Sequence, residues 1–499
     1  MRLRTNLAQQ YAGVLHYTGL ILVLGGLLML CPLAVLVAWP QESRHAAAFL
    51  IPAAVLCVVG AVLWRAFRAA GTRGLSAQYA GVVVLLSWLT ICLFSAWPLA
   101  AALKMSFTHA FFESVSGWTT TGLSVVDVTQ TPHLILLWRS IMQLAGGAGF
   151  AIIMLAALLG PVGPALTLAE GRTDQLVPHV RQSAKLVLLL YAGYAAAGVT
   201  AYALSGMSVF DAINHAFAAI STGGFSTRSE SIGHWDSPLV EAVSIPLMVL
   251  GNMNFLTAYL LFRGRFRAVS RSGELRLMAV LLPVCMLCLL FSVCLPLYAT
   301  LGKSVRVAVF ETFTALTTTG FSTVSYDRWG SESIFILIVL MLVGGGACST
   351  AGGIKQYRVY VLFKTVTWDI RRALLPRTAV VENHIWQGES KDFISEDRLR
   401  RVGTFVFLYL ATYFLGVAIV AAHGYGVKES LFEFASALGT VGLSVGVTSS
   451  QAPRLVLWTQ IAGMFLGRLE FFVVIVSLVK IAEDALSMLS LGRAREGRN

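Results

Sequence analysis

A short motif of hydroxyl-bearing and glycine residues occurs four times in the chain, and its residue types suit a cation. The pattern is T-x-G-[LF]-S, and its glycines are spaced 102, 96 and 122 residues apart. Threonine supplies hydroxyl oxygen, and glycine permits backbone angles that aim successive carbonyls at one axis. Rings of carbonyls replace the hydration shell of a monovalent cation. The four copies are Thr120-Thr121-Gly122, Thr222-Gly223-Gly224, Thr318-Thr319-Gly320 and Thr440-Val441-Gly442.

A polar residue stands nine positions before each motif glycine. It is a glutamate after phenylalanine in three copies, Glu113, Glu311 and Glu433, and His215 holds the place in the second copy. We expect the glutamates to anchor the segment before each loop; direct contact with the ion is the alternative. For the T-x-G loops themselves, the alternative to a cation site is that they are helix caps or packing glycines. That alternative does not explain four copies at matching positions.

The elements around the motifs are apolar segments of two lengths. The chain has 499 residues, of which 57% are hydrophobic and 12% charged, with a mean hydropathy of +0.74. Soluble proteins are ~25% charged, so this composition excludes a soluble enzyme, a disordered chain and a disulfide scaffold. Runs of ~20 apolar residues cross the ~30 Å hydrocarbon core as helices. Ten crossings are predicted, at 14–39, 47–68, 77–103, 133–159, 184–206, 237–263, 275–300, 333–366, 402–423 and 454–490.

Shorter apolar segments precede the motifs, at 107–121, 209–223, 305–319 and 429–441. Each is about 13 residues long, or ~18 Å as a helix, so it can enter the membrane but not cross it. Each then points its C-terminal end, with its partial negative charge, toward the loop, which favours a cation.

Lysine and arginine are distributed unevenly between the two sides of the predicted membrane domain. With the N terminus inside, the inner segments carry 27 of the 37 basic residues, which predicts cytoplasmic N and C termini. The four short segments then enter from outside. Because the basic residues lie between apolar segments rather than on one soluble face, a nucleic-acid partner is not expected.

The predicted fold class is an all-α polytopic membrane protein. Four helix–pore-loop–helix repeats surround a pseudo-fourfold pore and follow two N-terminal transmembrane helices. The predicted boundaries are 1–76 for the two-helix extension, 77–160, 161–264 and 265–366 for repeats one to three, 367–400 for a cytoplasmic linker, and 401–499 for repeat four and the tail.

Four unequal T-x-G loops in one chain resemble the Trk/Ktr/HKT superfamily of cation transporters. The two leading helices and the length resemble its bacterial Trk-type potassium-uptake membrane subunit. The resemblance implies that the motif residues quoted above, from Thr120 to Gly442, form a filter whose carbonyls bind K⁺, the transported ion. Some plant relatives carry serine at the first glycine and favour sodium; this chain keeps Gly122, which favours potassium.

A glycine-rich stretch interrupts the predicted second helix of the third repeat. Five glycines in ten residues should break a helix, and such a break at membrane depth should line a cavity. The resemblance implies that this stretch is a mobile gate, with Lys355 at its inner end; close packing of glycines is the alternative. The gate residues are Gly344, Gly345, Gly346, Ala347, Cys348, Ser349, Thr350, Ala351, Gly352 and Gly353.

Two further features lie at membrane depth. Arg468 lies inside the last predicted span, where a charge costs at least ~2.5–3.5 kcal/mol unless it faces a cavity or a partner. The resemblance places this arginine in the pore beneath the filter, where it could hold the gate; a structural pair with Glu470 or with a pore-helix glutamate is the alternative.

For the second glycine-rich run, Gly146–Gly149, we favour close packing over a role in gating. Acidic residues after the motifs could concentrate cations at the mouth, although we expect most to be caps or solvated loop residues: Asp127, Glu230, Asp236 and Asp327.

The sequence has no evident nucleotide-hydrolysing motif. We therefore expect potassium uptake without enzyme chemistry or a covalent cofactor, driven by the membrane potential or by an ion gradient, as in a symport. The resemblance implies a multi-pass protein of the bacterial cytoplasmic (inner) membrane, in contact with membrane lipid, a homodimer, and controlled by a cytoplasmic nucleotide-binding regulatory subunit. The alternatives are a sodium-preferring or sodium-coupled member of the same fold and a membrane-embedded enzyme. For the enzyme, no nucleophile–base or metal pattern is apparent.

Overall fold

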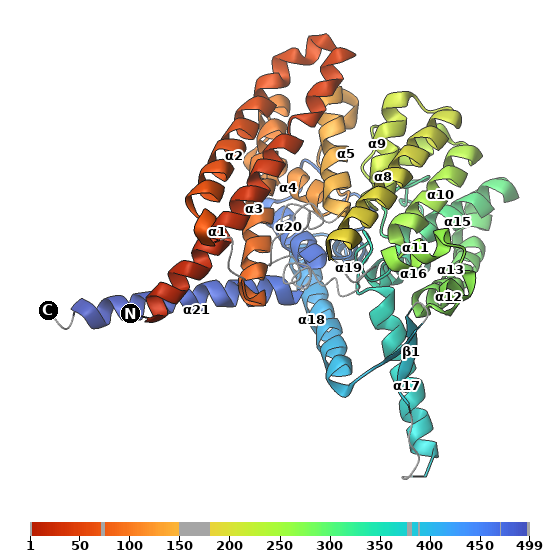
Figure 1. Ribbon diagram of the computed structural model, residues 1–499. Coiled ribbons are helices and arrows are strands. Elements are labelled where there is room, and N and C mark those ends of the chain that lie inside the picture. Colours follow the sequence, from red (N-terminus) through yellow and green to blue (C-terminus); the bar gives the residue numbers. More distant parts are fainter. Residues whose placement is uncertain are drawn as a thin grey trace.

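Helices make up nearly all the regular structure of the computed structural model (Figure 1). It describes residues 2–70, 75–148, 180–376, 382–387, 390–469 and 471–496. The predicted all-helical membrane fold is therefore confirmed for the described residues. The part of the predicted span 133–159 beyond residue 148, including Gly149, lies outside them.

The two N-terminal helices form an antiparallel hairpin in close contact. A Cβ atom on Gly19 would lie 2.7 Å from the carbonyl oxygen of Gly60, and one on Gly60 would lie 2.6 Å from that of Gly19. The predicted span 14–39 overlaps a candidate span at Leu7–Val37, within which α1 ends at Leu28 and a short 3-10 helix follows from Cys31. The elements are α1 (Arg2–Leu28), η1 (Cys31–Val37), η2 (Pro40–His45), α2 (Ala46–Ala66) and η3 (Arg68–Ala70).

Each of the four repeats contains a long helix, a short pore helix and a second helix. The first is α3 (Ala77–Leu103), α4 (Phe107–Trp118), η4 (Val128–Gln130) and α5 (His133–Gly147). The second is α8 (Val180–Leu204), α9 (Val209–Ile220), η5 (Ser231–Trp235), α10 (Pro238–Asn252) and α11 (Phe255–Phe262), with α12 (Phe266–Arg271) after it. The third is α13 (Gly273–Leu289), η6 (Leu290–Cys294), α14 (Leu295–Leu297), α15 (Leu301–Leu316), α16 (Ser331–Val343) and α17 (Gln356–Leu374). The fourth is α18 (Glu396–Ala421), α19 (Val427–Leu438), α20 (Arg454–Leu469) and α21 (Phe471–Glu496).

Among the described residues, six helices are long and apolar enough to cross a membrane, or up to eight if each bent pair is one span. The predicted spans 237–263 and 454–490 each consist of a pair of helices with a bend between them. α10 and α11 meet at 118°, and α20 and α21 at 104°. At the first bend, the Asn254 side chain caps α11 by accepting a hydrogen bond from the Leu256 amide at 2.8 Å. α21 runs crosswise (Figure 1), and its residue Asp484 accepts hydrogen bonds from Tyr79 and Tyr11 at 3.1 and 3.2 Å.

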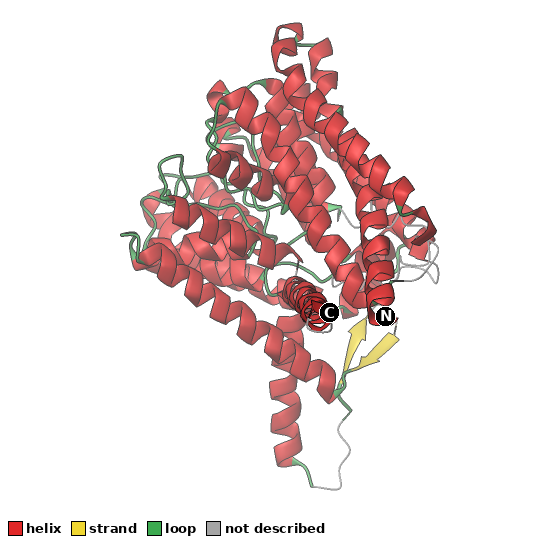
Figure 2. Cartoon of the chain, turned by 90° about the vertical axis from the view of Figure 1, so that its left-hand side faces the viewer, coloured by secondary structure: helices red, strands yellow, loops and turns green. Residues whose placement is uncertain are grey.

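The polar segment 367–400 contains the end of α17, a β-hairpin and the start of α18. The strands β1 (His384–Gln387) and β2 (Ser390–Phe393) pair antiparallel. Figures 1 and 2 place the hairpin toward the end of the bundle where both termini lie. Ile385 and Ile394 pack with Val361 and Trp368 of α17 in a small apolar cluster, which fixes the hairpin against that helix.

The close contact of α1 and α2 predicts a large effect of a single methyl group. Gly60→Ala should destabilise the protein by about 1–3 kcal/mol, the range for overpacking a well-packed interface. Thermal unfolding in detergent measures the loss. Gly193→Ala is the matched control, because Gly193 also lies in a helix but has no atom within 4 Å of a Cβ. Equal melting temperatures for the two variants would contradict the role of the contact.

Candidate functional site

Each pore helix ends in the same hydrogen-bonded turn, with a threonine in the left-handed region. The φ angles of these threonines lie between 49° and 54°, a conformation that non-glycine residues rarely adopt. In the first repeat, the Thr120 amide donates to the Gly117 carbonyl at 3.1 Å and the Thr121 amide to the Ser116 carbonyl at 2.9 Å, the pattern of a Schellman cap. Strain of about 1–3 kcal/mol per residue persists only where the surroundings impose it. The four threonines are Thr120, Thr222, Thr318 and Thr440.

The four motif glycines lie in one closed ring. All have φ between 72° and 100°, and each lies against the carbonyl group that precedes the glycine of the next loop. A Cβ atom would overlap that oxygen in every case: Gly122 with Gly223, Gly224 with Thr319, Gly320 with Val441 and Gly442 with Thr121. The order of contacts returns to the first repeat, so the four loops surround a common axis.

The ring suits a dehydrated monovalent cation. The threonine at φ near 50° and the glycine two residues later alternate with a residue of negative φ, which turns successive carbonyls to one side. Four pore-helix C-terminal ends, with their partial negative charge, meet at the ring. The hydroxyls of Thr120 and Thr440 are buried and have no hydrogen-bond partner among the described residues. These oxygens are suited to contact a cation at the inner end of the ring.

The polar residues nine positions before the glycines form hydrogen bonds with the segment that follows each T-x-G loop. Glu113 accepts from the Ser124 hydroxyl at 2.9 Å and the Val125 amide at 3.1 Å. The equivalent bonds run from Thr323 to Glu311, from Ser444, Val445 and Thr448 to Glu433, and between Ser226 and His215. The predicted anchoring role of the glutamates is therefore confirmed.

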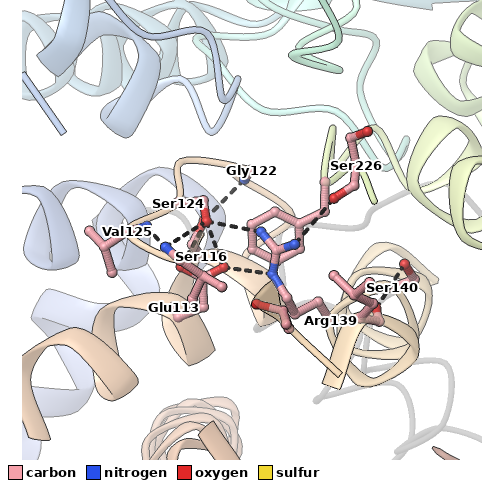
Figure 3. A network of polar contacts seen from close by, with 12 residues as sticks. Glu113, Ser116, Gly122, Ser124, Val125, Arg139, Ser140 and Ser226 are labelled. Carbon is pink, nitrogen blue, oxygen red and sulfur yellow. Dashed lines mark hydrogen bonds and ion pairs between the residues drawn. The ribbon is translucent and has the colours of Figure 1, made fainter. Parts of the chain in front are cut away.

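A buried arginine joins the first and second filter loops (Figure 3). The Arg139 Nε donates to Glu113 Oε1 at 2.7 Å, and both side chains are at most 2% exposed. Its other nitrogens donate to the Ser124 hydroxyl at 2.9 Å and the Ser226 carbonyl at 3.3 Å. The guanidinium carbon lies 3.9 Å from the centre of the Phe225 ring. The Arg139 guanidinium thus fixes the separation of two adjacent loops.

A cavity of about 660 Å³ opens above the filter glycines, and Asp127 and Glu230 are part of its lining. Thr129 donates its hydroxyl and amide hydrogens to Asp127 at 2.6 and 3.0 Å. These bonds lower the pKa of the Asp127 carboxyl below its ordinary value, which keeps it ionised at the mouth. Asp236 instead pairs with Lys303 and Arg306, and Asp327 accepts from the Ser325 hydroxyl.

The glycine-rich stretch lies directly beneath the filter. Helix α16 ends at Val343 and α17 begins at Gln356, so the predicted break is confirmed. The Gly352 amide donates to the Thr318 hydroxyl at 2.8 Å, and the Thr350 hydroxyl lies 3.1 Å from that of Thr222. A Cβ atom on Gly352 would also overlap the carbonyl of Gly439. The glycine-rich residues Gly344–Gly353 therefore contact three of the four T-x-G loops.

Arg468 holds this loop. It donates to the Thr350 carbonyl and, at 2.6 Å, to the Gly146 carbonyl. It thereby links α20 to the loop and to α5; the alternative partner, Glu470, lies outside the described residues. Gly146 is packed as predicted, since a Cβ there would overlap the Trp118 carbonyl. Lys355, at the inner end, donates to the Ala351 carbonyl.

Three site residues were not predicted from the sequence, namely Arg139, Gln143 and Asn252. Gln143 donates to the Gly223 carbonyl at 2.5 Å and accepts from the Phe225 amide at 3.2 Å. Asn252 accepts from the Gly346 amide of the glycine-rich loop through its carbonyl oxygen and its side-chain oxygen. A charged or amide side chain within an apolar run was the signal that could have identified each of them.

The chain matches known cation transporters over nearly its full length. The family model TrkH, described as cation transport protein, matches residues 45–489. An uncharacterized cation transporter of Methanocaldococcus jannaschii is 31% identical, covering 96% of this chain and 97% of that protein. The Trk system potassium uptake protein TrkG of Escherichia coli is 30% identical over 93% and 96%. The crystal structure of the potassium transporter TrkH from Vibrio parahaemolyticus superimposes with a TM-score of 0.82 at 26% identity, covering 94% of this chain and 98% of that one.

The buried pair of Arg139 and Glu113 predicts an asymmetric effect of substitution. Arg139→Met should destabilise the protein by about 3–5 kcal/mol, because the carboxylate then stays buried without its counter-charge. Adding Glu113→Gln should recover part of that loss. Thermal unfolding in detergent measures both effects.

Arg400→Met is the control, since the exposed pair Arg400–Asp397 should contribute under about 1 kcal/mol. If the double variant is less stable than Arg139→Met alone, the assigned ion pair is wrong.

Proposed function

The chain belongs to the TrkH family of cation transport proteins, and on that premise we propose that it carries potassium into the cell through the ring of loop carbonyls. The observation that carries the proposal is the closed order of the four motif glycines, each against the carbonyl before the next. A ring of this kind exchanges the ion's water for fixed backbone oxygens. The substrate is the ion itself, and no covalent cofactor is required.

Selectivity rests on the size and rigidity of this ring. The anchors formed by Glu113, Glu311, Glu433 and His215 hold the strand beyond each glycine. Gly122 keeps the first loop close to the second, where a serine side chain would press the loops apart. Sodium preference is the competing function, and the selectivity measurement below decides between the two.

Gating is the proposed role of Gly344–Gly353. The loop lies against the inner ends of three of the four filter loops. It is held by Arg468, whose positive charge opposes the passage of a cation. Conduction therefore requires the loop to leave this position. A cytoplasmic nucleotide-binding subunit would supply the control, as the resemblance implies. The excess of Lys and Arg on one side of the membrane domain supports the proposal that the gate faces the cytoplasm and that both termini lie on the cytoplasmic side of a bacterial inner membrane.

The membrane potential is a sufficient driving force. It supplies ~2.3 kcal/mol per charge for every 100 mV, which supports roughly 40-fold accumulation at ~1.4 kcal/mol per tenfold. Coupling to a second ion, as in a symport, would add to this gradient without altering the filter. The functional unit implied by the resemblance is a homodimer.

The filter assignment predicts that Gly122→Ser lowers the preference for K⁺ over Na⁺ by about tenfold or more, a change of ~1.4 kcal/mol. The added side chain meets the carbonyl of the second loop at a backbone φ of 90°. Rubidium and sodium fluxes into proteoliposomes measure the ratio.

Gly446→Ser is the matched control. Gly446 has a φ of 92° but no atom within 4 Å of a Cβ, so it shares the backbone strain without touching the ring. Unchanged selectivity in Gly122→Ser, or an equal change in both variants, would disprove the assignment. A wild-type protein that favours sodium would establish the competing function.

The gate assignment predicts that Arg468→Ala increases flux about tenfold in the absence of a partner protein. Charge-assisted hydrogen bonds contribute about 1.5–3 kcal/mol each, and this variant loses those that hold the loop. Rubidium uptake measures the rate. Arg454→Ala, at the other end of α20, is the control and should leave the rate unchanged. Reduced flux in correctly folded Arg468→Ala would contradict the gate assignment.

A further inference from the structure

The gate loop has a second charged attachment in addition to Arg468. In the first turn of α13, Glu274 Oε1 accepts a hydrogen bond from the Ala347 amide at 2.7 Å. Arg468 donates to the Thr350 carbonyl, three residues further along the loop. An anion therefore binds a loop N–H while a cation binds a loop C=O. Each side-chain charge is opposite in sign to the partial charge of the backbone group that it contacts, which strengthens the hydrogen bond.

The bend between α10 and α11 supports the same part of the loop. Where a helix ends, its last carbonyl groups lack partners within the helix. The Gly346 amide donates to the Asn252 carbonyl at 3.1 Å and lies 3.2 Å from its side-chain oxygen. The Thr350 amide and hydroxyl donate to the Gly251 carbonyl at 3.2 and 2.8 Å. The gate loop thus supplies donors that the broken helix lacks, and the 118° bend and the loop stabilise each other.

Burial strengthens the contact with Glu274. Its side chain is 9% exposed and that of Asn252 is 2% exposed, so water competes weakly for the loop amides. Hydrogen bonds to charged groups exceed neutral ones in strength, and more so at low dielectric. Of the hydrogen bonds described here from Asn252, Gly251 and Glu274 to the loop, the bond between the Glu274 carboxylate and the Ala347 amide involves a full charge.

We propose that Glu274 is a positioning residue that latches the gate loop closed, so that the loop leaves the pore only when the carboxylate releases the Ala347 amide. This inference rests on the proposed function and adds a specific closing contact to it. Asn252 and the bend form the surface on which the latched loop rests. Arg468 and Glu274 together hold the loop at two points, and release of either one weakens the closed state.

The position of Glu274 depends on the cytoplasmic end of the fold. The preceding residue, Gly273, packs so closely on the Tyr360 ring of α17 that a Cβ atom would overlap it. Two residues earlier, the Arg271 guanidinium lies 4.7 Å from the centre of the Trp386 ring in β1. Movement of the β-hairpin or of α17 would therefore shift the first turn of α13. This gives the latch a mechanical link to the face where a cytoplasmic regulator would bind.

The test compares two glutamates in equivalent positions of neighbouring helices. Glu274→Gln keeps the side-chain size but removes the charge, whereas Glu332→Gln alters the exposed first-turn glutamate of α16. Purified full-length protein in proteoliposomes, without a partner, is assayed for rubidium and sodium uptake. We expect about a tenfold higher rubidium flux for Glu274→Gln, an unchanged rubidium-to-sodium ratio because the filter is intact, and a wild-type rate for Glu332→Gln.

A second variant and a second measurement distinguish an effect on the gate loop from misfolding of the Glu274→Gln variant. Glu274→Asp keeps the charge but is one methylene shorter, so it too should raise the flux. In a chain whose other six cysteines are alanine, a maleimide should label Cys348 in the gate loop faster when Glu274 is substituted. An equal flux and labelling rate for Glu274→Gln, Glu274→Asp and wild type would overturn the latch, as would a lowered flux or an altered ion ratio. Absence of cation flux in the wild type would instead overturn the proposed function.

Discussion

The contact between each filter glycine and the carbonyl of the next loop is the constraint on which the rest of the structure depends. At all four positions there is no room for a Cβ atom, and at all four φ is positive. The loops can approach one another only because these residues have no side chain. The strained threonines, the caps of the pore helices and the anchoring carboxylates serve to hold twelve loop residues in that arrangement. A cation that binds the ring would itself relieve the mutual repulsion of the carbonyl oxygens.

The four repeats have the same loop conformation, but different side chains hold each loop in place. The first and second loops are tied by Arg139, whereas Glu311 is held by Tyr326 and Glu433 by Thr448, which in turn accepts from Gln460. A single chain with four unequal copies allows each repeat to acquire its own support. It also allows one repeat, the third, to have a broken second helix, and this break is the proposed gate.

Charged side chains contact backbone groups of the glycine-rich loop Gly344–Gly353, which is the proposed gate. Arg468 binds a loop carbonyl and Glu274 binds a loop amide, so a cation and an anion both stabilise the observed position of the loop. The bend of α10 and α11 lies against the same loop.

The amino-acid sequence determined the class of the protein and the positions of the four T-x-G loops that form the proposed filter. Composition and apolar run length identify membrane helices, and four T-x-G motifs with glutamate or histidine nine residues earlier locate the loops, because these signals are local. The break at Gly344–Gly353 was likewise visible in glycine content. The sequence did not reveal that 237–263 and 454–490 bend, nor that Arg139, Asn252 and Glu274 contact distant loops. Those contacts join residues 26 to 94 positions apart, and only the packing of the repeats around one axis decides which buried polar group meets which backbone atom.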